Sequence, residues 1–137
     1  MELDTTKESR DLACATVLKL TDQIVLIRFK DGANVELEDA VNLSDACIEL
    51  FGEEKFLALI DARNMEGSVD KKASNYFAQN EKVVTQRMAQ AIVVNTLALK
   101  LLARFYIMVN KPKREVKICT EIEEAMVWLD TKKHLLE

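Results

Sequence analysis

An uninterrupted run of five apolar residues, 56–60 (FLALI), constrains the fold of this chain more than any other feature of its sequence. A continuous apolar run of this length, closed by the carboxylate of Asp61, is typical of a buried strand. A polar loop containing Arg63, Asn64 and Ser68 follows it, and a helical pattern comes next. In open α/β sheets, ligands and modification sites gather just past the carboxyl ends of the strands. The sequence therefore predicts a buried strand whose exit loop is a candidate site.

The length and composition favour one folded domain. The chain has 137 residues, of which 49% are hydrophobic and 31% are charged, and this is typical of a globular protein that buries its own core. We expect a single domain over residues 1–137, with its core at about 12–130. The net charge of −4 argues against nucleic acid as a partner, because phosphate binding requires a concentrated positive surface.

Three cysteines, Cys14, Cys47 and Cys119, occur without a CxxC pair. This pattern is typical of reduced thiols in a cytoplasmic protein, each packed as a small hydrophobic side chain. Residues 1–4 include no basic region followed by an apolar one, so we expect no secretory signal. The longest apolar stretch, 97–109, is shorter than the about 20 residues that a bilayer span needs. These features together predict a cytoplasmic location.

The order of the predicted elements is that of an α/β domain. Strands are expected at 12–20, 24–29, 56–60, 88–94 and 115–118, and helices at 37–51, 69–85, 97–109 and from 120 onwards. Ser68 is predicted to cap the helix at 69–85, and Thr120 with Glu123 to form a capping box on the last helix. Strands that alternate with helices favour parallel pairing, while the first two strands can form an antiparallel hairpin. The predicted architecture is one mixed sheet.

The order of these elements and three local features resemble the STAS-like group of small bacterial proteins, which is similar in fold to the anti-sigma-factor antagonists (the SpoIIAA-like fold). The three features are the strand that ends in Asp61, the Asn110-Lys111-Pro112 cluster before the last strand, and the segment 120–129 (TEIEEAMVWL). The resemblance covers about 12–130. It implies a central mixed sheet of four or five strands with the helices mainly on one face.

In signalling members of the wider STAS superfamily, the loop after this strand carries an Asp followed directly by a phosphorylatable Ser, where a partner kinase binds. Asp61 matches the Asp, but Ala62 stands in the place of the Ser. The usual phospho-acceptor is therefore missing from its position. The resemblance leaves a phospho-regulated switch through Ser68 as one hypothesis.

The sequence contains no motif for catalysis, for a metal or for a cofactor. His134 is the only histidine, and nothing in the sequence places it near Cys47, Cys119 or Ser68 to form a nucleophile with an adjacent base. No His/Cys/Asp cluster has the spacing of metal ligands, and neither of the Gly-rich phosphate-binding motifs occurs. We therefore expect no catalytic residue, no metal and no cofactor, and a protein that is not an enzyme.

The exit loop of the buried strand is the best polar candidate. Arg63 and Asn64 could contact an anion or an acidic partner, with help from the free N–H groups at the start of the next helix. In a second interpretation, Asp61 pairs with Arg63, and Ser68 is only a helix cap. The second interpretation explains every residue of the loop without a ligand.

The segment 97–109 predicts a helix that is apolar nearly all round, with one narrow polar stripe. A helix that packs on a sheet buries only one side, so this helix has apolar surface to spare. A second subunit, a neighbouring helix or lipid could cover this surface, and its basic residues would permit binding at an anionic membrane. The candidate interface or lipid residues are Lys100, Leu101, Arg104, Phe105 and Met108.

The leading hypothesis is a non-enzymatic STAS-like module that acts through protein–protein association, as a homodimer or with another protein. The alternative is a carrier of a small molecule or lipid, with an apolar pocket between the sheet and helix 97–109. In that alternative, Lys100 or Arg104 would face a headgroup. Nucleic acid is not expected as a partner, and a membrane surface ranks below a protein.

Overall fold

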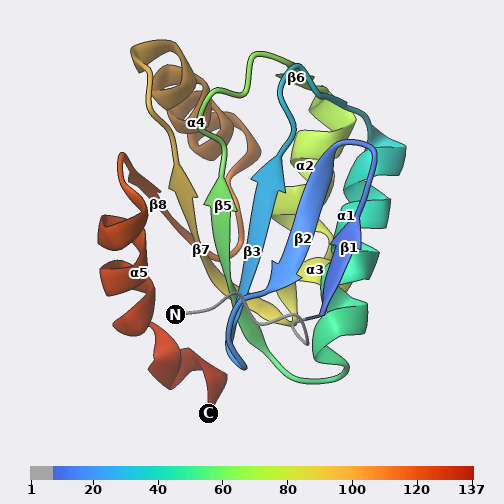
Figure 1. Cartoon of the computed structure of the whole chain (residues 1–137), viewed down its shortest axis with the longest axis vertical. Helices are drawn as coiled ribbons and strands as arrows, with labels where there is room; N and C mark the ends of the chain where they lie inside the picture. The colour runs from blue at the N-terminus through green and yellow to red at the C-terminus, as the bar shows by residue number, and fades with distance from the viewer. Residues whose placement is uncertain (1–7) are drawn as a thin grey trace.

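A computed structural model describes residues 8–137 and contains a six-stranded mixed sheet in the order β1-β2-β3-β5-β7-β8. Its strands are β1 (Ser9–Asp11), β2 (Ala15–Lys19), β3 (Ile24–Phe29), β5 (Phe56–Asp61), β7 (Arg87–Val93) and β8 (Glu115–Cys119). The first three strands pair antiparallel, and the pairs from β3 to β8 are parallel (Figure 1). A separate two-stranded parallel pair joins β4 (Asn34–Val35) to β6 (Ser68–Val69).

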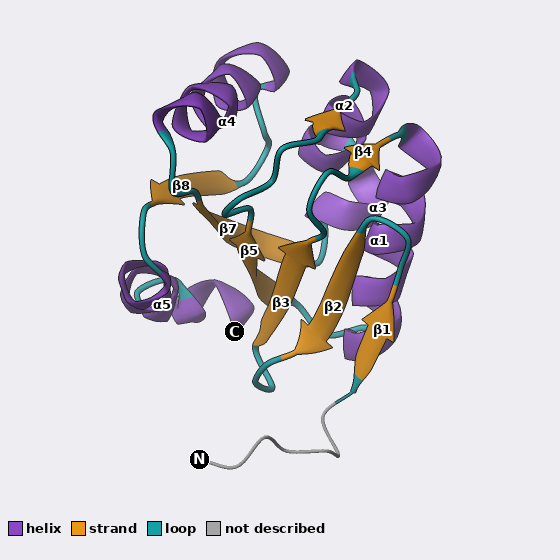
Figure 2. Ribbon diagram, turned by 45° about the horizontal axis from the view of Figure 1, so that its top comes forward, coloured by secondary structure: helices purple, strands orange, loops and turns teal. Residues whose placement is uncertain are grey.

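The helices in the described residues are α1 (Leu37–Phe51), α2 (Lys71–Gln79), α3 (Glu81–Val84), α4 (Leu97–Asn110) and α5 (Ile122–Asp130), followed by the 3₁₀-helix η1 (Lys133–Leu136). Helices α1 to α4 lie on one side of the sheet, and α5 lies on the other (Figure 2). The predicted α/β fold with its helices mainly on one face is therefore confirmed. No helix of residues 8–137 has both the length and the apolar character needed to span a bilayer.

The two faces of the sheet carry two separate apolar layers. Because side chains alternate along a strand, Val25 and Ala58 point toward α1 and α2, whereas Ile24, Leu57 and Leu59 point toward α5. The predicted strand at 56–60 forms the centre of both layers, since β5 lies between β3 and β7. Both faces of β5 are covered, which explains why its sequence is apolar without alternation.

The sheet has six strands rather than the predicted four or five. The predicted strand at 12–20 is in fact the second half of a hairpin, and β1 lies before it. The Leu12 N–H donates to the Ala15 carbonyl at 2.9 Å, so the chain turns where the prediction had it continue straight. The first strand is short and partly exposed, and its alternation is too brief to show in the sequence.

The helix predicted at 69–85 is two helices, because Asn80 has extended backbone between α2 and α3. The Asn80 side chain accepts the Lys82 N–H at 3.0 Å and so caps the second helix. The cap of α2 is Asp70, which accepts two backbone N–H groups, and the predicted cap Ser68 is wrong. Ser68 lies in β6 instead, and its hydroxyl donates to Asn34 Oδ1 at 2.9 Å.

The capping box predicted on the last helix from Thr120 and Glu123 is also wrong. The residue that precedes α5 is Glu121, whose side chain makes no capping hydrogen bond. Glu124, and not Glu123, reaches back to accept the Thr120 N–H at 3.1 Å. Thr96 caps α4, since its hydroxyl accepts the Leu99 N–H at 3.1 Å.

Candidate functional site

A cavity lies beneath helix α4. Ala103 is the one buried residue of this helix, which packs along α2 and β8. A cavity of about 710 Å³ lies between α4, α2, α1 and the α1-side face of the sheet. Its size is that of a small-molecule site, since such pockets commonly enclose roughly 300–1,000 Å³.

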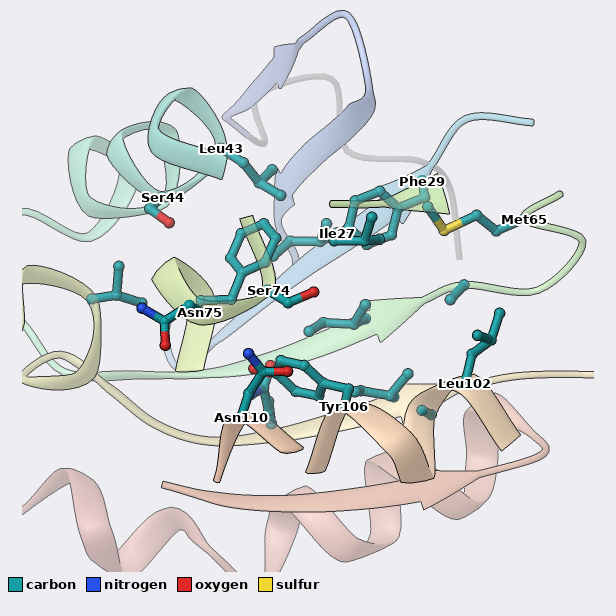
Figure 3. A pocket seen from close by; sticks show the side chains of 18 of the residues that line it. Ile27, Phe29, Leu43, Ser44, Met65, Ser74, Asn75, Leu102, Tyr106 and Asn110 are labelled. Carbon is teal, nitrogen blue, oxygen red and sulfur yellow. The ribbon is translucent and has the colours of Figure 1, made fainter. Parts of the chain in front are cut away.

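The walls of the cavity are mainly apolar. Figure 3 shows Ile27 and Phe29 of β3 and Leu43 of α1 on the side opposite Leu102 and Tyr106 of α4. Ser74 and Asn75 of α2 lie between these two groups. Other apolar lining residues are Phe56, Ile60, Met65, Phe77, Ile92 and Leu99. The walls therefore offer mainly dispersion contacts to an apolar molecule.

Strand β7 contributes Arg87 and Gln90 to the cavity lining. Among the described residues, no other strand places a charged side chain there. A β-bulge brings both to the same face. Arg87 pairs with Phe56, but the next pair is Leu57 with Ala89, so β7 has one extra residue at this point.

Arg87 is a buried cation without an acidic partner in residues 8–137. The residue is 5% exposed, and its Nη2 donates to the Phe77 carbonyl at 2.6 Å, at the end of α2. Its Nε has no hydrogen-bond partner among the described residues. Burial lowers the pKa of Arg87, and the positive charge of Arg114 lowers it further. An unpaired buried charge is costly, because it has lost its hydration without compensation.

Two further polar atoms beside Arg87 have no hydrogen-bond partner within the described chain, Gln90 Nε2 and Tyr106 Oη. Burial raises the pKa of Tyr106, although Arg87 and Gln90 act in the opposite direction. The Gln90 amide is thus near the Tyr106 hydroxyl, but the pair does not meet hydrogen-bond geometry. Buried polar groups normally find a partner in protein, water or ligand, so three orphaned atoms in one cavity require an explanation.

The cavity also contains the thiol of Cys47 on α1. Burial raises the pKa of Cys47 to about 12, against the opposing effect of Arg87. A thiol with this pKa stays protonated at neutral pH and is a poor nucleophile. Cys47 therefore contributes to the cavity as a small apolar side chain, as the sequence predicts.

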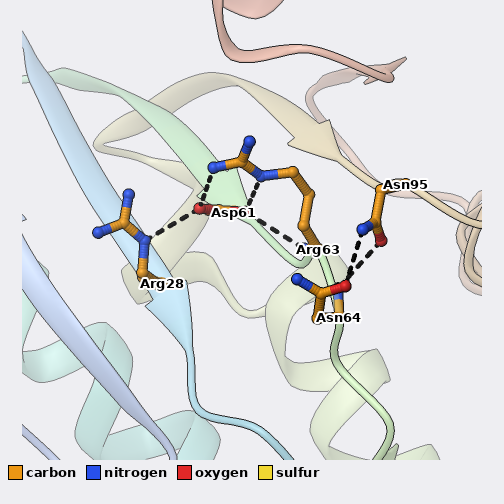
Figure 4. A network of polar contacts seen from close by, with 5 residues as sticks. All are labelled: Arg28, Asp61, Arg63, Asn64 and Asn95. Carbon is orange, nitrogen blue, oxygen red and sulfur yellow. Dashed lines mark hydrogen bonds and ion pairs between the residues drawn. The ribbon is translucent and has the colours of Figure 1, made fainter.

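At the end of β5, Asp61 is held by two arginines (Figure 4). Its carboxylate accepts from Arg28 Nε at 2.9 Å, from Arg63 Nε at 2.9 Å and from Arg63 Nη2 at 3.0 Å. Burial acts to raise the pKa of Asp61, but these hydrogen bonds outweigh it and lower the pKa to about 2. Asp61 and Arg63 thus pair with each other, as the second interpretation of this loop expected.

The rest of the loop is also satisfied by its own contacts. Asn64 adopts a left-handed backbone with φ of 61° and exchanges two hydrogen bonds with Asn95. The Asn64 N–H donates to Asn95 Oδ1 at 3.0 Å, and Asn95 Nδ2 donates to Asn64 Oδ1 at 2.8 Å. With Ser68 bonded to Asn34, the loop candidates Asp61, Arg63, Asn64 and Ser68 form a fixed polar edge. None of these contacts requires a ligand.

The structure divides the candidate residues of α4 between two sides. Phe105 lines the cavity, whereas Lys100, Leu101, Arg104 and Met108 do not. The buried charged group of the cavity lining is thus Arg87. Neither Lys100 nor Arg104, one of which would face a headgroup in the carrier alternative, lines the cavity. Leu101, Phe105 and Met108 are all more than half exposed.

Arg87, Gln90 and Tyr106 were not among the sequence candidates. Gln90 could have been recognised as a candidate from the sequence, because it is the one polar residue in the apolar segment 88–94 and a buried strand does not need an amide. The bulge that brings Arg87 to the same face has no comparable sequence signal. Tyr106 is one of many large side chains on α4, and an aromatic residue at helical spacing is more often part of a core or an interface than of a ligand site.

Comparisons with known proteins agree with the fold. A protein-family model described as "Domain of unknown function (DUF7793)" matches residues 18–133. A crystal structure of an uncharacterised protein from the DUF3478 family of Shewanella loihica PV-4, described as having a SpoIIAA-like fold, is similar with a TM-score of 0.56. The two chains are 12% identical, and the match covers 94% of this chain and 98% of that one. No curated protein matches the sequence. The chain therefore has a SpoIIAA-like fold, as its resemblance to the STAS-like group implied.

Proposed function

The chain belongs to the DUF7793 family of domains of unknown function, and from its SpoIIAA-like fold and its cavity we propose that it is a non-enzymatic STAS-like module that binds a small amphipathic molecule. The observation that carries this proposal is the cavity of about 710 Å³ beneath α4, with apolar walls and three unpartnered polar atoms. A concave, mainly apolar site with a few convergent polar groups is the usual form of a small-molecule site.

The position of α4 supports entry of a ligand from solvent. Leu102, Phe105 and Val109 line the cavity, yet each is more than half exposed. These side chains thus border both the cavity and the solvent. A bound apolar molecule would cover part of this surface, and the hydrophobic effect would favour its binding.

The groups around the cavity favour binding over catalysis. Its thiol, Cys47, has a pKa raised to about 12 by burial, and no histidine lies in the cavity lining to act as its base. His134 is exposed in η1, which packs on the opposite face of the sheet. Within residues 8–137, no group of three His, Cys, Asp or Glu side chains is arranged to hold a metal ion.

Binding of a neutral apolar probe tests this proposal without assuming the ligand. N-phenyl-1-naphthylamine becomes fluorescent in apolar surroundings, so we expect a saturable increase that fits one site for each chain. Dodecan-1-ol should displace the probe in competition. A linear, non-saturating signal at all probe concentrations would contradict the proposal.

The outward side of α4 favours a second candidate function, self-association as a homodimer. Leu97, Leu101 and Met108 are 72%, 53% and 66% exposed and do not line the cavity. Large apolar side chains grouped on one helix face are typical of interaction surfaces. Sedimentation velocity tests this candidate: we expect a dimer at micromolar concentration that Leu101→Glu dissociates, and a wild-type monomer would contradict it.

A further inference from the structure

We propose that the molecule bound beneath α4 carries a single carboxylate, which Arg87, Gln90 and Tyr106 bind at the polar floor of the cavity. Its apolar chain or ring would then contact the walls formed by α1, α2 and α4. This inference rests on the proposed function, because it names the chemical class of the ligand for the same site. The three residues are hereafter called the polar floor.

The charge of the polar floor favours one negative charge on the ligand. Arg87 is 5% exposed, and no acidic residue in the described chain pairs with it. None of the residues that line the cavity is an aspartate or a glutamate. Apart from Arg87, the one basic lining residue is Lys71, which is exposed at the start of α2. A carboxylate would neutralise the buried guanidinium and remove the cost of leaving it unpaired.

The hydrogen-bonding groups of the polar floor are suited to a carboxylate. Arg87 Nε and Gln90 Nε2 can only donate, and both lack a partner in residues 8–137. The Tyr106 hydroxyl can donate as well, and its raised pKa keeps the proton on it at neutral pH. An ionised carboxylate only accepts, with two oxygens and about four lone-pair sites, so it can receive all three.

A structural role of Arg87 accounts for only part of these contacts. Through Nη2, Arg87 donates to the Phe77 carbonyl near the C-terminal end of α2, which stabilises that helix end. This contact leaves Nε without a partner and gives no reason for Gln90 or Tyr106 to lie beside it. A carboxylate ligand accounts for all three orphaned atoms.

Other headgroups match the polar floor less well. A neutral alcohol would leave Arg87 unpaired. A phosphate monoester carries about 1.5 to 2 negative charges at neutral pH, and a single buried guanidinium offsets only one. The balance of charge therefore favours a monocarboxylate over both.

Calorimetric titration of the full chain with dodecanoate, dodecan-1-ol and dodecyl phosphate tests the inference, because these probes share one chain and differ in headgroup. At neutral pH we expect dodecanoate to bind at least about tenfold more tightly than the other two, as a charge-assisted hydrogen-bonded pair predicts. Equal affinity of dodecanoate and dodecan-1-ol would overturn the carboxylate inference and leave the proposed function intact. If none of the three binds, both the inference and the proposed function fail.

Two variants locate the preference for dodecanoate at the polar floor. Arg87→Met should abolish this preference, and Tyr106→Phe should weaken dodecanoate about threefold or more without affecting dodecan-1-ol. Tyr106→Phe removes an oxygen that has no partner in residues 8–137, so it remains informative if Arg87→Met does not fold. The matched control is Arg104→Met, which removes an exposed arginine outside the cavity and should leave all affinities unchanged. A wild-type preference in Tyr106→Phe, or its loss in Arg104→Met, would overturn the assignment.

Discussion

Arg87 and Gln90 face the same side of the sheet although they are three positions apart in β7, because β7 bulges opposite Phe56 and Leu57. In a regular strand, residues at this spacing point to opposite faces, and one of the two would lie beneath α5. The bulge thus brings a buried charge and a buried amide together under α4. Bulges are common beside functional sites, where they redirect a side chain.

Gln90→Leu is expected to stabilise the ligand-free protein by about 1 kcal/mol, because it replaces an unpartnered buried amide with an apolar side chain. Urea unfolding followed by circular dichroism measures the free energy. Gln86→Leu is the matched control and should destabilise, since Gln86 Nε2 donates to the Gly52 and Glu54 carbonyls. A loss of stability in Gln90→Leu would show that the amide has a partner in the free protein.

Ala103→Trp should weaken binding of the neutral probe by at least about tenfold, because a large side chain at this position enters the cavity that a ligand needs. Ala103 lies between Leu99 and Tyr106 on the inner side of α4, and all three line the cavity. Leu101→Trp, on the outer side, should leave the probe affinity unchanged. Fluorescence titration compares the two variants, and an equal effect of both would place the probe outside the cavity.

Asp61→Asn should cost about 1 to 2 kcal/mol of unfolding free energy at neutral pH. The estimate is below the full worth of the pKa shift because Arg28 and Arg63 are 56% and 38% exposed, and solvent screens part of the pairing. The wild-type advantage should be complete above the unfolded pKa of 3.8 and disappear as the pH falls toward about 2.

Unfolding of wild type and Asp61→Asn across this pH range measures that difference. Asp22→Asn, at an exposed turn residue, controls for the general effect of removing a carboxylate. A wild-type advantage that grows as the pH falls below 3.8 would contradict the ion-pair account of the exit loop.

Gly67→Ala should destabilise the protein by at least about 2 kcal/mol, since the added Cβ would lie 1.6 Å from the Ala33 carbonyl oxygen. The Ser68 N–H donates to that same carbonyl, so the clash would separate β4 from β6. Gly32→Ala should cost only about 1 kcal/mol, because its φ of 70° strains an alanine but its Cβ meets no atom within 4 Å. Thermal unfolding ranks the two variants, and a milder effect at Gly67 would contradict this close approach.

Long elements with a strong pattern could be predicted from the sequence. The apolar run 56–60 is the core of β5, and the helices predicted at 37–51 and 97–109 match α1 and α4 within one residue. Short elements could not, because a few residues carry too little periodicity. Asn80 shows this well: it ends one helix and caps the next within a segment that is helical in pattern throughout.

The site was predicted only in outline. A pocket between the sheet and helix 97–109 was only the alternative to a protein-association surface, and the structure contains a cavity there. Its charged residue was not predictable, because Arg87 comes just before the strand expected at 88–94 and reaches the cavity only through a bulge. The basic residues that the sequence made prominent, Lys100 and Arg104, lie outside the cavity lining.

The most direct test of the carboxylate site is the pKa of the bound carboxyl group, followed by the ¹³C chemical shift of carboxyl-labelled dodecanoic acid in complex with the protein. A carboxylate paired with Arg87 should have a pKa below that of the free acid, and Arg87→Met should raise it. A bound carboxyl pKa above that of the free acid in the wild-type complex would contradict the account, because it would place the headgroup in apolar surroundings away from Arg87.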